Sequence, residues 1–258
     1  MLGWFRGRRA RPDPLIEADR WRRVAVGLPW VAALDAGRSA RLSSLAARFL
    51  ASKTITPVDG LELGDDQRCA LAAVCCLPLL EFGVEGLHGW SELIVYPAAF
   101  RVERRHTDAG DIAELEVVHE GDDELIGEAW DYGPLVLSWA DIQADIADPT
   151  AGFCVAAHEM AHKLDILDGA MDGTPPLPRA WQRAWARDFQ RDYDAFVEVV
   201  DAGTDTTIDP YAAQSPEEFF AVCTEYHFGA PDVLREAFPD VAAHLARFYG
   251  PSPLAAAA

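Results

Sequence analysis

Apolar residues recur at helical spacing through the first third of the chain. Over residues 19–52 they recur at intervals that fit one helix face, and over residues 65–82 they are almost continuous. Both segments predict helices, the first broken near Pro29 and Gly37 and the second largely buried. The most apolar run, residues 69–80, is too short to cross a bilayer, so we expect no membrane segment.

The middle of the chain has a different pattern. Three short segments, residues 93–96, 113–119 and 134–139, are rich in β-branched, aliphatic or aromatic side chains and are separated by Gly and Asp clusters. They predict the strands of one small mixed sheet. Helical spacing then returns over residues 150–167, over residues 179–200, and from near Ser215 and Asp232. We therefore expect an α+β fold that is mostly helical.

Charge is distributed unevenly along the chain. The formal net charge is −20, although seven of the first 23 residues are Arg. The acidic main body is poorly suited to binding the phosphate backbone of a nucleic acid, so we expect no direct nucleic-acid binding. Solubility is the simplest role for this acidity. We expect a basic arm at residues 1–20, a single domain at 21–250 and a disordered tail at 251–258.

Two further features favour a cytoplasmic location. The basic residues of the first segment are followed by no continuous apolar stretch, unlike those of a secretory signal. The five cysteines are an odd number, form no C-x-x-C pair and lie in apolar surroundings. We therefore expect buried, reduced thiols rather than disulfides.

Residues 155–165, VAAHEMAHKLD, contain a candidate metal site. His158 and His162 are four residues apart, so on a helix they lie one turn apart on one face and can bind the same ion. Glu159 is placed to take a proton from water at that ion, as a general base. Histidines that only form hydrogen bonds or face solvent are the alternative, but unpaired polar groups are costly on so apolar a helix. We expect one Zn²⁺ per chain, with Mn²⁺ or Ni²⁺ less suited to these ligands.

A third ligand must come from elsewhere, and a carboxylate is a common choice. The apolar helix expected at residues 215–228, SPEEFFAVCTEYHF, begins with Glu217 and Glu218. The same residues fit a capping box that starts at Ser215, with Pro216 at the first helical position. Composition does not distinguish a ligand from a cap.

Other polar residues near the histidines have less specific roles. Asp165, one turn after His162, can accept a hydrogen bond from a ligating imidazole or can solvate the helix end. Lys163 is expected to point away and to be solvated. The remaining histidines have no metal-like spacing and are expected at the surface or in packing; they are His88, His106, His227 and His244.

Three ordered motifs resemble one known family. HEMAHKLDILDGAMDG, the preceding GPLVLSWADIQ and the later DPYAAQSPEEFFAVCTEYHF are similar to the Mlc titration factor family of bacterial zinc metallopeptidases, over about residues 20–250. The resemblance implies a zincin-like fold with the HExxH sequence on its active-site helix. This family is in turn similar to the catalytic domain of the lethal-factor toxin peptidase.

The resemblance also implies roles for individual residues. Glu218 rather than Glu217 would be the third zinc ligand, although both neighbours are Glu. His119 matches a further metal-binding position; a fourth protein ligand would take the place of the catalytic water and mark a resting state. An ordinary strand histidine is the alternative. Tyr211, seven residues before Glu218, would assist catalysis by donating to the oxyanion, or else is a packing residue.

The expected function is zinc-dependent peptide hydrolysis, with an aminopeptidase favoured by the resemblance and a peptide as the substrate. The family is also linked to binding of the Mlc repressor. The alternative is therefore a zinc-stabilised regulatory protein that sequesters a transcription repressor of the Mlc type, with little peptidase activity. The sequence contains no recognisable motif for docking such a repressor.

Overall fold

The structure is a computed structural model that describes residues 14–98 and 133–255. Helices account for most of these residues. They are α1 (Ala18–Val26), α2 (Pro29–Ala32), α3 (Ala36–Ser52), α4 (Asp65–Cys76), α6 (Trp139–Ala147), α7 (Val155–Asp165), α8 (Arg179–Asp201), α9 (Pro216–Gly229), α10 (Pro231–Ala237) and α11 (Pro239–Tyr249). The short 3₁₀ turns are η1 (Leu77–Leu79), η2 (Val84–Leu87), η3 (Ile166–Asp168) and η4 (Pro210–Ala213).

Local sequence signals explain where many of these helices begin. The side chains of Asp35, Ser138 and Ser215 each accept a hydrogen bond from a backbone N–H in the first turn of α3, α6 and α9. Proline opens α2, α9, α10 and α11, where its missing N–H costs nothing. The helix starts are therefore set largely by residues next to them in sequence.

The described sheet has three parallel strands in the order β1 (Thr54–Pro57), β2 (Glu92–Tyr96) and β3 (Leu135–Ser138). Leu93 of β2 pairs with Leu135 of β3, and Val95 pairs with Leu137. All four side chains are almost completely buried, so one face of the sheet is part of the core. The side chains between them are only half-buried, which is the alternation expected of a sheet with one covered face.

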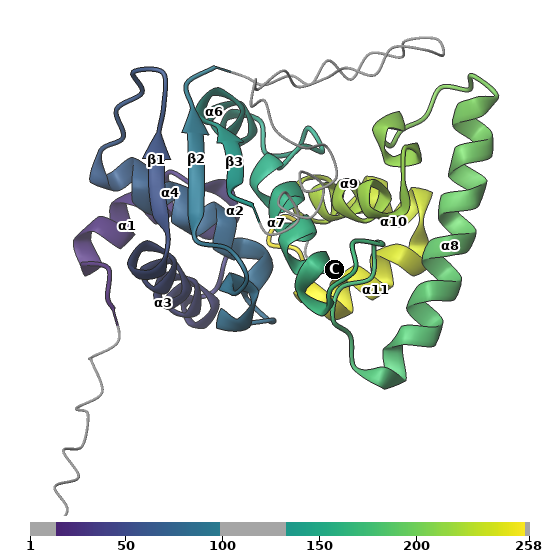
Figure 1. Cartoon of the computed structure of the whole chain (residues 1–258), viewed down its shortest axis with the longest axis horizontal. Coiled ribbons are helices and arrows are strands. Elements are labelled where there is room, and N and C mark those ends of the chain that lie inside the picture. Colours follow the sequence, from purple (N-terminus) through teal and green to yellow (C-terminus); the bar gives the residue numbers. More distant parts are fainter. Residues whose placement is uncertain (1–13, 99–132, 256–258) are drawn as a thin grey trace, which may run out of the picture.

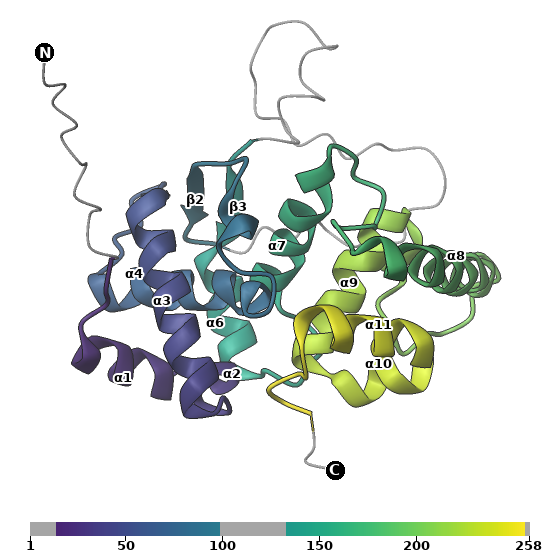
Figure 2. The same cartoon turned by 90° about the horizontal axis from the view of Figure 1, so that it is seen from below.

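The arrangement of the layers places α7 at the centre (Figure 1). Helices α1–α4 and the sheet lie on one side of it, and α8, α10 and α11 lie on the other side. Helix α9 packs beside α7 in both views (Figure 2). Two helices that are distant in sequence therefore run next to each other through the middle of the molecule.

The prediction of a mostly helical fold with one small sheet is confirmed, but one strand of the sheet was missed. The three described strands are all parallel, and the mixed sheet stays a prediction. Strand β1 was missed because it is only four residues long and ends in Pro57, although Thr54, Ile55 and Thr56 are β-branched. The strand predicted at residues 113–119 lies outside the described residues.

The predicted arm and tail are partly included in the described fold. Helix α1 already begins at Ala18, and Arg20 pairs with Asp65 of α4 at 2.8 Å. After α11, Leu254 packs against the core, and Arg38 of α3 donates to the carbonyl of Pro251 at 3.1 Å. All five cysteines are buried and free, as predicted. No helix of the described ranges is long and apolar enough to cross a membrane.

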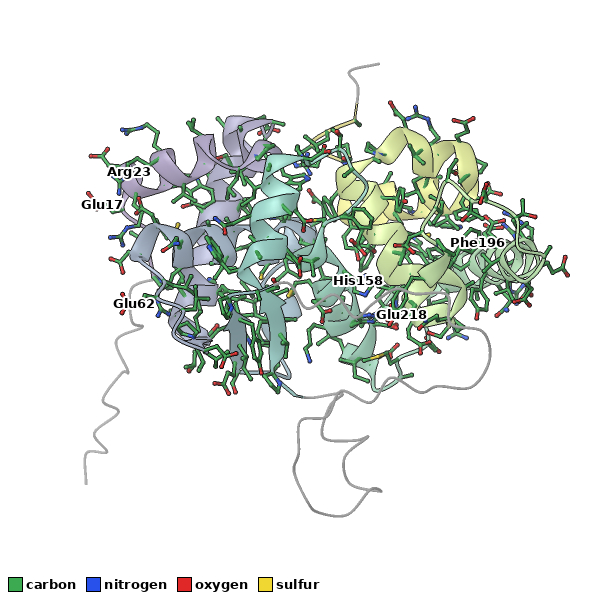
Figure 3. The ribbon with its side chains drawn as sticks, turned by 90° about the horizontal axis from the view of Figure 1, so that it is seen from above. Glu17, Arg23, Glu62, His158, Phe196 and Glu218 are labelled. Atoms are coloured by element: carbon green, nitrogen blue, oxygen red, sulfur yellow. The ribbon has the colours of Figure 1, made fainter. Side chains whose placement is uncertain are left out.

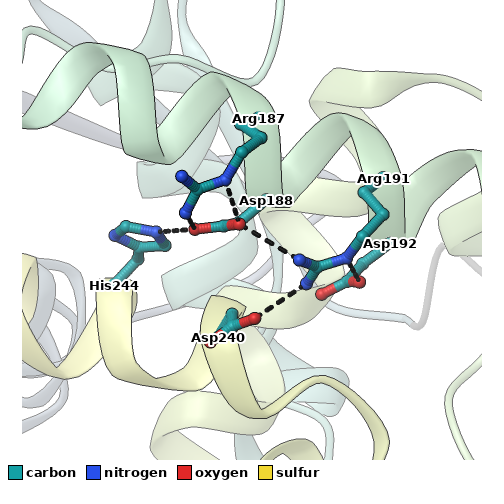
Figure 4. Close-up of polar contacts among 6 residues, drawn as sticks. All are labelled: Arg187, Asp188, Arg191, Asp192, Asp240 and His244. Atoms are coloured by element: carbon teal, nitrogen blue, oxygen red, sulfur yellow. Dashed lines mark hydrogen bonds and ion pairs between the residues drawn. The ribbon is translucent and has the colours of Figure 1, made fainter.

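A buried carboxylate joins α8 to α11 (Figure 4). Asp188 of α8, only 3% exposed, accepts two hydrogen bonds of 2.8 Å from Arg187 and one of 2.9 Å from His244 of α11. Arg191 adds a contact of 3.1 Å to Asp188 and reaches Asp240 of α11 at 2.9 Å. The Arg187 hydrogen bonds, reinforced by His244, outweigh burial and lower the pKa of Asp188 to about 2.

Asp188→Asn should lower the free energy of unfolding by about 1 to 2 kcal/mol at pH 7, allowing for the exposed guanidinium of Arg187. Because the folded pKa is lowered, this stability is present above the ordinary carboxyl pKa and is lost as the pH falls from about 4 towards 2. Urea unfolding of both proteins at pH 7 and pH 3 measures it. Asp232→Asn, which removes an exposed ion pair with Arg235, is the control. Equal losses at both pH values would contradict this assignment.

Candidate metal centre

Helix α7 presents both histidines of the motif to one place. His158 and His162 lie one turn apart, and their ring centroids are separated by 4.9 Å. The His158 side chain is buried, and other residues of α7 such as Met160 and Ala161 are completely buried as well. Two imidazoles are thus held in a poorly solvated position, where each needs a polar partner.

Helix α9 brings a carboxylate to the same place. Ser215 caps the helix by accepting from the backbone N–H of Glu218 at 3.4 Å, and Pro216 occupies the first position. The side chain of Glu218 does not complete a capping box but points towards His158 (Figure 3). Cap and candidate ligand therefore coexist, because Ser215 provides the cap and Glu218 is free to face α7.

The three side chains converge closely. His158 Nε2 lies 3.2 Å from His162 Nε2 and 3.2 Å from Glu218 Oε2, and His162 Nε2 lies 3.6 Å from Glu218 Oε1. Ligand atoms on a tetrahedral zinc ion, with bonds of about 2.0 to 2.1 Å, are separated by about 3.3 Å. In the described part of the chain, these three residues form a group whose ligand atoms lie within 4.8 Å of one another.

The electrostatics of this group favour a cation. Burial lowers the pKa of His158, but the carboxylates of Glu225 and Glu218 outweigh burial and raise it to about 10. Burial raises the pKa of Glu218, but the two histidines more than reverse that effect and hold it well below its usual range. Both shifts have the same physical cause, because each side stabilises the charge of the other.

Unsatisfied polar atoms support the same conclusion. Glu218 Oε2 and His162 Nδ1 are buried, and within the described ranges neither has a well-directed hydrogen bond. Such atoms are costly unless they are paired. A divalent cation among two imidazoles and one carboxylate would satisfy Glu218, and this donor set suits zinc. The residues present therefore fit the metal that the sequence predicts.

The two predicted catalytic residues lie beside the three candidate ligands. Glu159 follows His158 on α7 and is half-buried, and its charge helps to raise the pKa of that histidine. The ring of Tyr211, in η4, lies 6.3 Å from the ring of His158 and is also half-buried. η4 packs against α9, which explains how Tyr211 reaches the histidine. His119 lies outside the described residues.

One residue of the site was not predicted. Glu225 of α9 is 2% exposed, and its Oε1 lies 2.7 Å from Nδ1 of His158. Its other oxygen, Oε2, accepts a hydrogen bond of 2.9 Å from the backbone N–H of Cys154. One feature of the sequence could have indicated Glu225. It lies two helical turns after Glu218 within an apolar helix, and this spacing places both carboxylates on one face.

Two residues near the motif differ from their predicted environments. Lys163 is buried rather than solvated, and its ammonium donates to the carbonyl of Gly133 at 3.0 Å. Asp165 is completely buried, and its Oδ2 accepts from the N–H of Gly173 at 2.7 Å. Its pKa is raised to about 7, mainly by burial. Asp165 therefore anchors the loop after α7, and no hydrogen bond joins it to His162 within the described ranges.

Gly173 fixes the distance between α7 and the beginning of α9. It has a positive φ of 80°, and a Cβ there would lie 2.5 Å from the backbone oxygen of Pro216. Its N–H binds Asp165, and its carbonyl accepts from Trp185 of α8 at 3.1 Å. Only a residue without a side chain allows this close approach in this backbone conformation. The loop thus holds the first turn of α9, which carries Glu218, in place.

The other described histidines are outside this group. His88 is exposed beside Glu85, and His244 belongs to the α8–α11 network. His227 is buried on α9, and burial lowers its pKa to about 4. Their predicted surface or packing roles agree with these positions.

Comparison with known proteins gives one consistent result. The sequence model of a family described as glucose-regulated metallo-peptidase M90 matches residues 2–250. A protein named Mlc titration factor A from Serratia proteamaculans is 37% identical over 236 residues, which are 90% of this chain and 87% of that protein. One of the same name from Enterobacter sp. is 34% identical over 260 residues, covering 98% and 93% of the two chains.

A third protein of that name, from Pectobacterium atrosepticum, is 37% identical over 240 residues, which cover 92% of this chain and 88% of that protein. These matches extend over nearly the whole length of both partners. They include both helices that form the three-residue group, α7 and α9. The chain therefore belongs to the M90 family of glucose-regulated metallo-peptidases.

Proposed function

We propose that this metallopeptidase is a zinc-dependent aminopeptidase in which His158, His162 and Glu218 hold the metal. The observation that carries the proposal is the convergence of two imidazoles and one carboxylate, with atoms 3.2 to 3.6 Å apart, from two helices packed side by side. Family membership supports a metal-dependent peptidase. The resemblance of the sequence motifs supports the narrower assignment to zinc and to peptide N-termini.

The chemistry divides between the metal and the protein. Zinc, when bound, supplies a positive charge that polarises the scissile carbonyl and makes a nearby water more acidic. Glu159 accepts the proton of the attacking water on its carboxylate and then delivers that proton to the leaving amine. The Tyr211 hydroxyl donates a hydrogen bond to the carbonyl oxygen as negative charge develops there. His119 as a fourth ligand of a resting state remains part of the proposal.

The first test uses the parent protein. Elemental analysis should find one equivalent of zinc, and a panel of aminoacyl chromogenic substrates should be cleaved. An N-terminally blocked version of the best substrate is the matched control, since an aminopeptidase should leave it intact. Cleavage of the blocked substrate would overturn the aminopeptidase assignment but keep the peptidase. A parent without metal would overturn the proposed site.

The shared name of the relatives favours a second candidate function. They are called Mlc titration factor A, which associates those proteins with the Mlc repressor. We propose a repressor of this type as a binding partner of the present chain. A pull-down of purified Mlc repressor with the Glu159→Gln protein separates the two functions. Retained binding by a variant that no longer hydrolyses peptides would support a regulatory role that is independent of catalysis.

A further inference from the structure

We propose that Glu225 is a positioning residue for the metal centre: it holds the His158 imidazole with the proton on Nδ1, so that Nε2 faces the metal. This inference rests on the proposed zinc site and adds a second residue of α9 to it. The carboxylate of Glu225 is 2% exposed and lies 2.7 Å from Nδ1 of His158. A contact this short and buried fixes the orientation of the ring.

The spacing of two glutamates explains how α9 controls this histidine. Glu218 and Glu225 are seven residues apart, so their side chains leave the helix on nearly the same side and about two turns apart. Glu218 reaches Nε2 of His158 at 3.2 Å, and Glu225 reaches Nδ1 of the same ring at 2.7 Å. One helix therefore contacts both nitrogens of a single imidazole, one on the metal side and one on the opposite side.

The second oxygen of Glu225 shows why a carboxylate is required there. It accepts from the backbone N–H of Cys154 at 2.9 Å, at the residue that precedes the first turn of α7. These two partners of Glu225 are both donors, the Cys154 N–H and the His158 Nδ1–H. A carboxylate accepts from both, whereas an amide has only one acceptor atom and must direct its NH₂ group at one of the two donors.

The two histidines differ in this respect. Nδ1 of His162 is buried and has no hydrogen-bond partner within the described ranges, and the nearby Asp165 is instead bound to Gly173. A carboxylate on the outer nitrogen of a metal-bound imidazole sets its tautomer and increases its basicity. Among the described contacts, His158 has a carboxylate on its outer nitrogen and His162 has none. We therefore expect His158 to depend more strongly on its outer partner.

The test compares the zinc-loaded parent with Glu225→Gln, which has nearly the same shape. Zinc affinity, measured by competition with a chromogenic chelator, should fall about 10- to 100-fold in the variant. Glu217→Gln removes a carboxylate from the same helix outside the metal group, so it should bind zinc as the parent does. An unchanged affinity in Glu225→Gln would overturn the inference. Urea unfolding of the metal-free proteins shows whether a lower affinity arises only from a loss of fold.

A second measurement follows the ring nitrogens of His158 in the parent and in Glu225→Gln. In the zinc-loaded parent with ¹⁵N-labelled histidine, the ring-nitrogen shifts of His158 should identify Nε2 as the ligand and Nδ1 as the protonated atom. In Glu225→Gln the Nδ1 proton should exchange faster with water. Ligation through Nδ1 in the parent would overturn the inference while leaving the zinc site intact. A parent that binds no zinc would overturn the proposed function on which the inference rests.

Discussion

Glu159→Gln is expected to keep one equivalent of zinc and to lower peptide hydrolysis by about 100- to 10,000-fold, the usual contribution of a general base. The change replaces a carboxylate by an amide of nearly the same size. It should leave His158, His162 and Glu218 in place, because Glu159 is not among the three converging residues. Loss of rate without loss of metal is therefore the expected result.

Single-turnover cleavage together with elemental analysis measures both quantities on one preparation. Glu217→Gln, half-buried in the first turn of α9, is the matched control and should cleave peptides at the parent rate. Glu159→Gln protein that hydrolyses peptides as fast as the parent would show that another group takes the proton. Loss of zinc in this variant would instead place Glu159 among the metal ligands.

His162→Ala should weaken zinc binding more than 100-fold, a larger effect than the roughly 10- to 100-fold typical of residues that only support a ligand. The imidazole lies within the proposed metal site, with Nε2 3.2 Å from His158 Nε2 and 3.6 Å from Glu218 Oε1. Its removal would leave two candidate ligands among the described residues. Hydrolysis should disappear together with the metal.

Equilibrium dialysis against zinc, followed by elemental analysis, is the direct measurement. His88→Ala removes an exposed histidine that pairs with Glu85 and lies outside the three-residue group, and it should bind zinc normally. If His162→Ala still retained one full equivalent after dialysis, the metal would have to lie elsewhere. Metal-free parent protein should behave like this variant in the cleavage assay and recover activity when zinc is returned.

The parts of the site that the sequence predicts are those whose contacts join residues close together in the sequence. The His158–His162 pair arises from a four-residue spacing, so the sequence predicts it directly. Glu218 was preferred over Glu217 by family resemblance, and its position depends on the packing of α9 against α7. Glu225 touches His158 across 67 residues of sequence, and nothing in its immediate neighbours indicates that contact. Glu225, which only tertiary packing brings to His158, was therefore missed.

The environment of Lys163 shows the same limit. A helix with one solvated face would expose the residue that follows His162, so solvation was expected. Helix α7, however, packs against α4, α6, α9 and β3, and only Val155, Glu159 and His162 of its residues are partly exposed. The lysine is consequently buried and bound to a backbone carbonyl. Periodicity predicts the helix correctly but does not reveal how many neighbours surround it.

The placement of α7 and α9 also has a consequence for protein synthesis. The ribosome completes α7 long before it reaches Glu218 and Glu225, so a growing chain first exposes two imidazoles on an apolar helix without their carboxylate partners. Trp30, near the beginning of the chain, can donate its hydrogen bond to the carbonyl of Phe228 only after an even longer segment has been synthesised. The proposed metal centre is thus assembled late in translation, and ions should be captured by the finished polypeptide rather than by the nascent one.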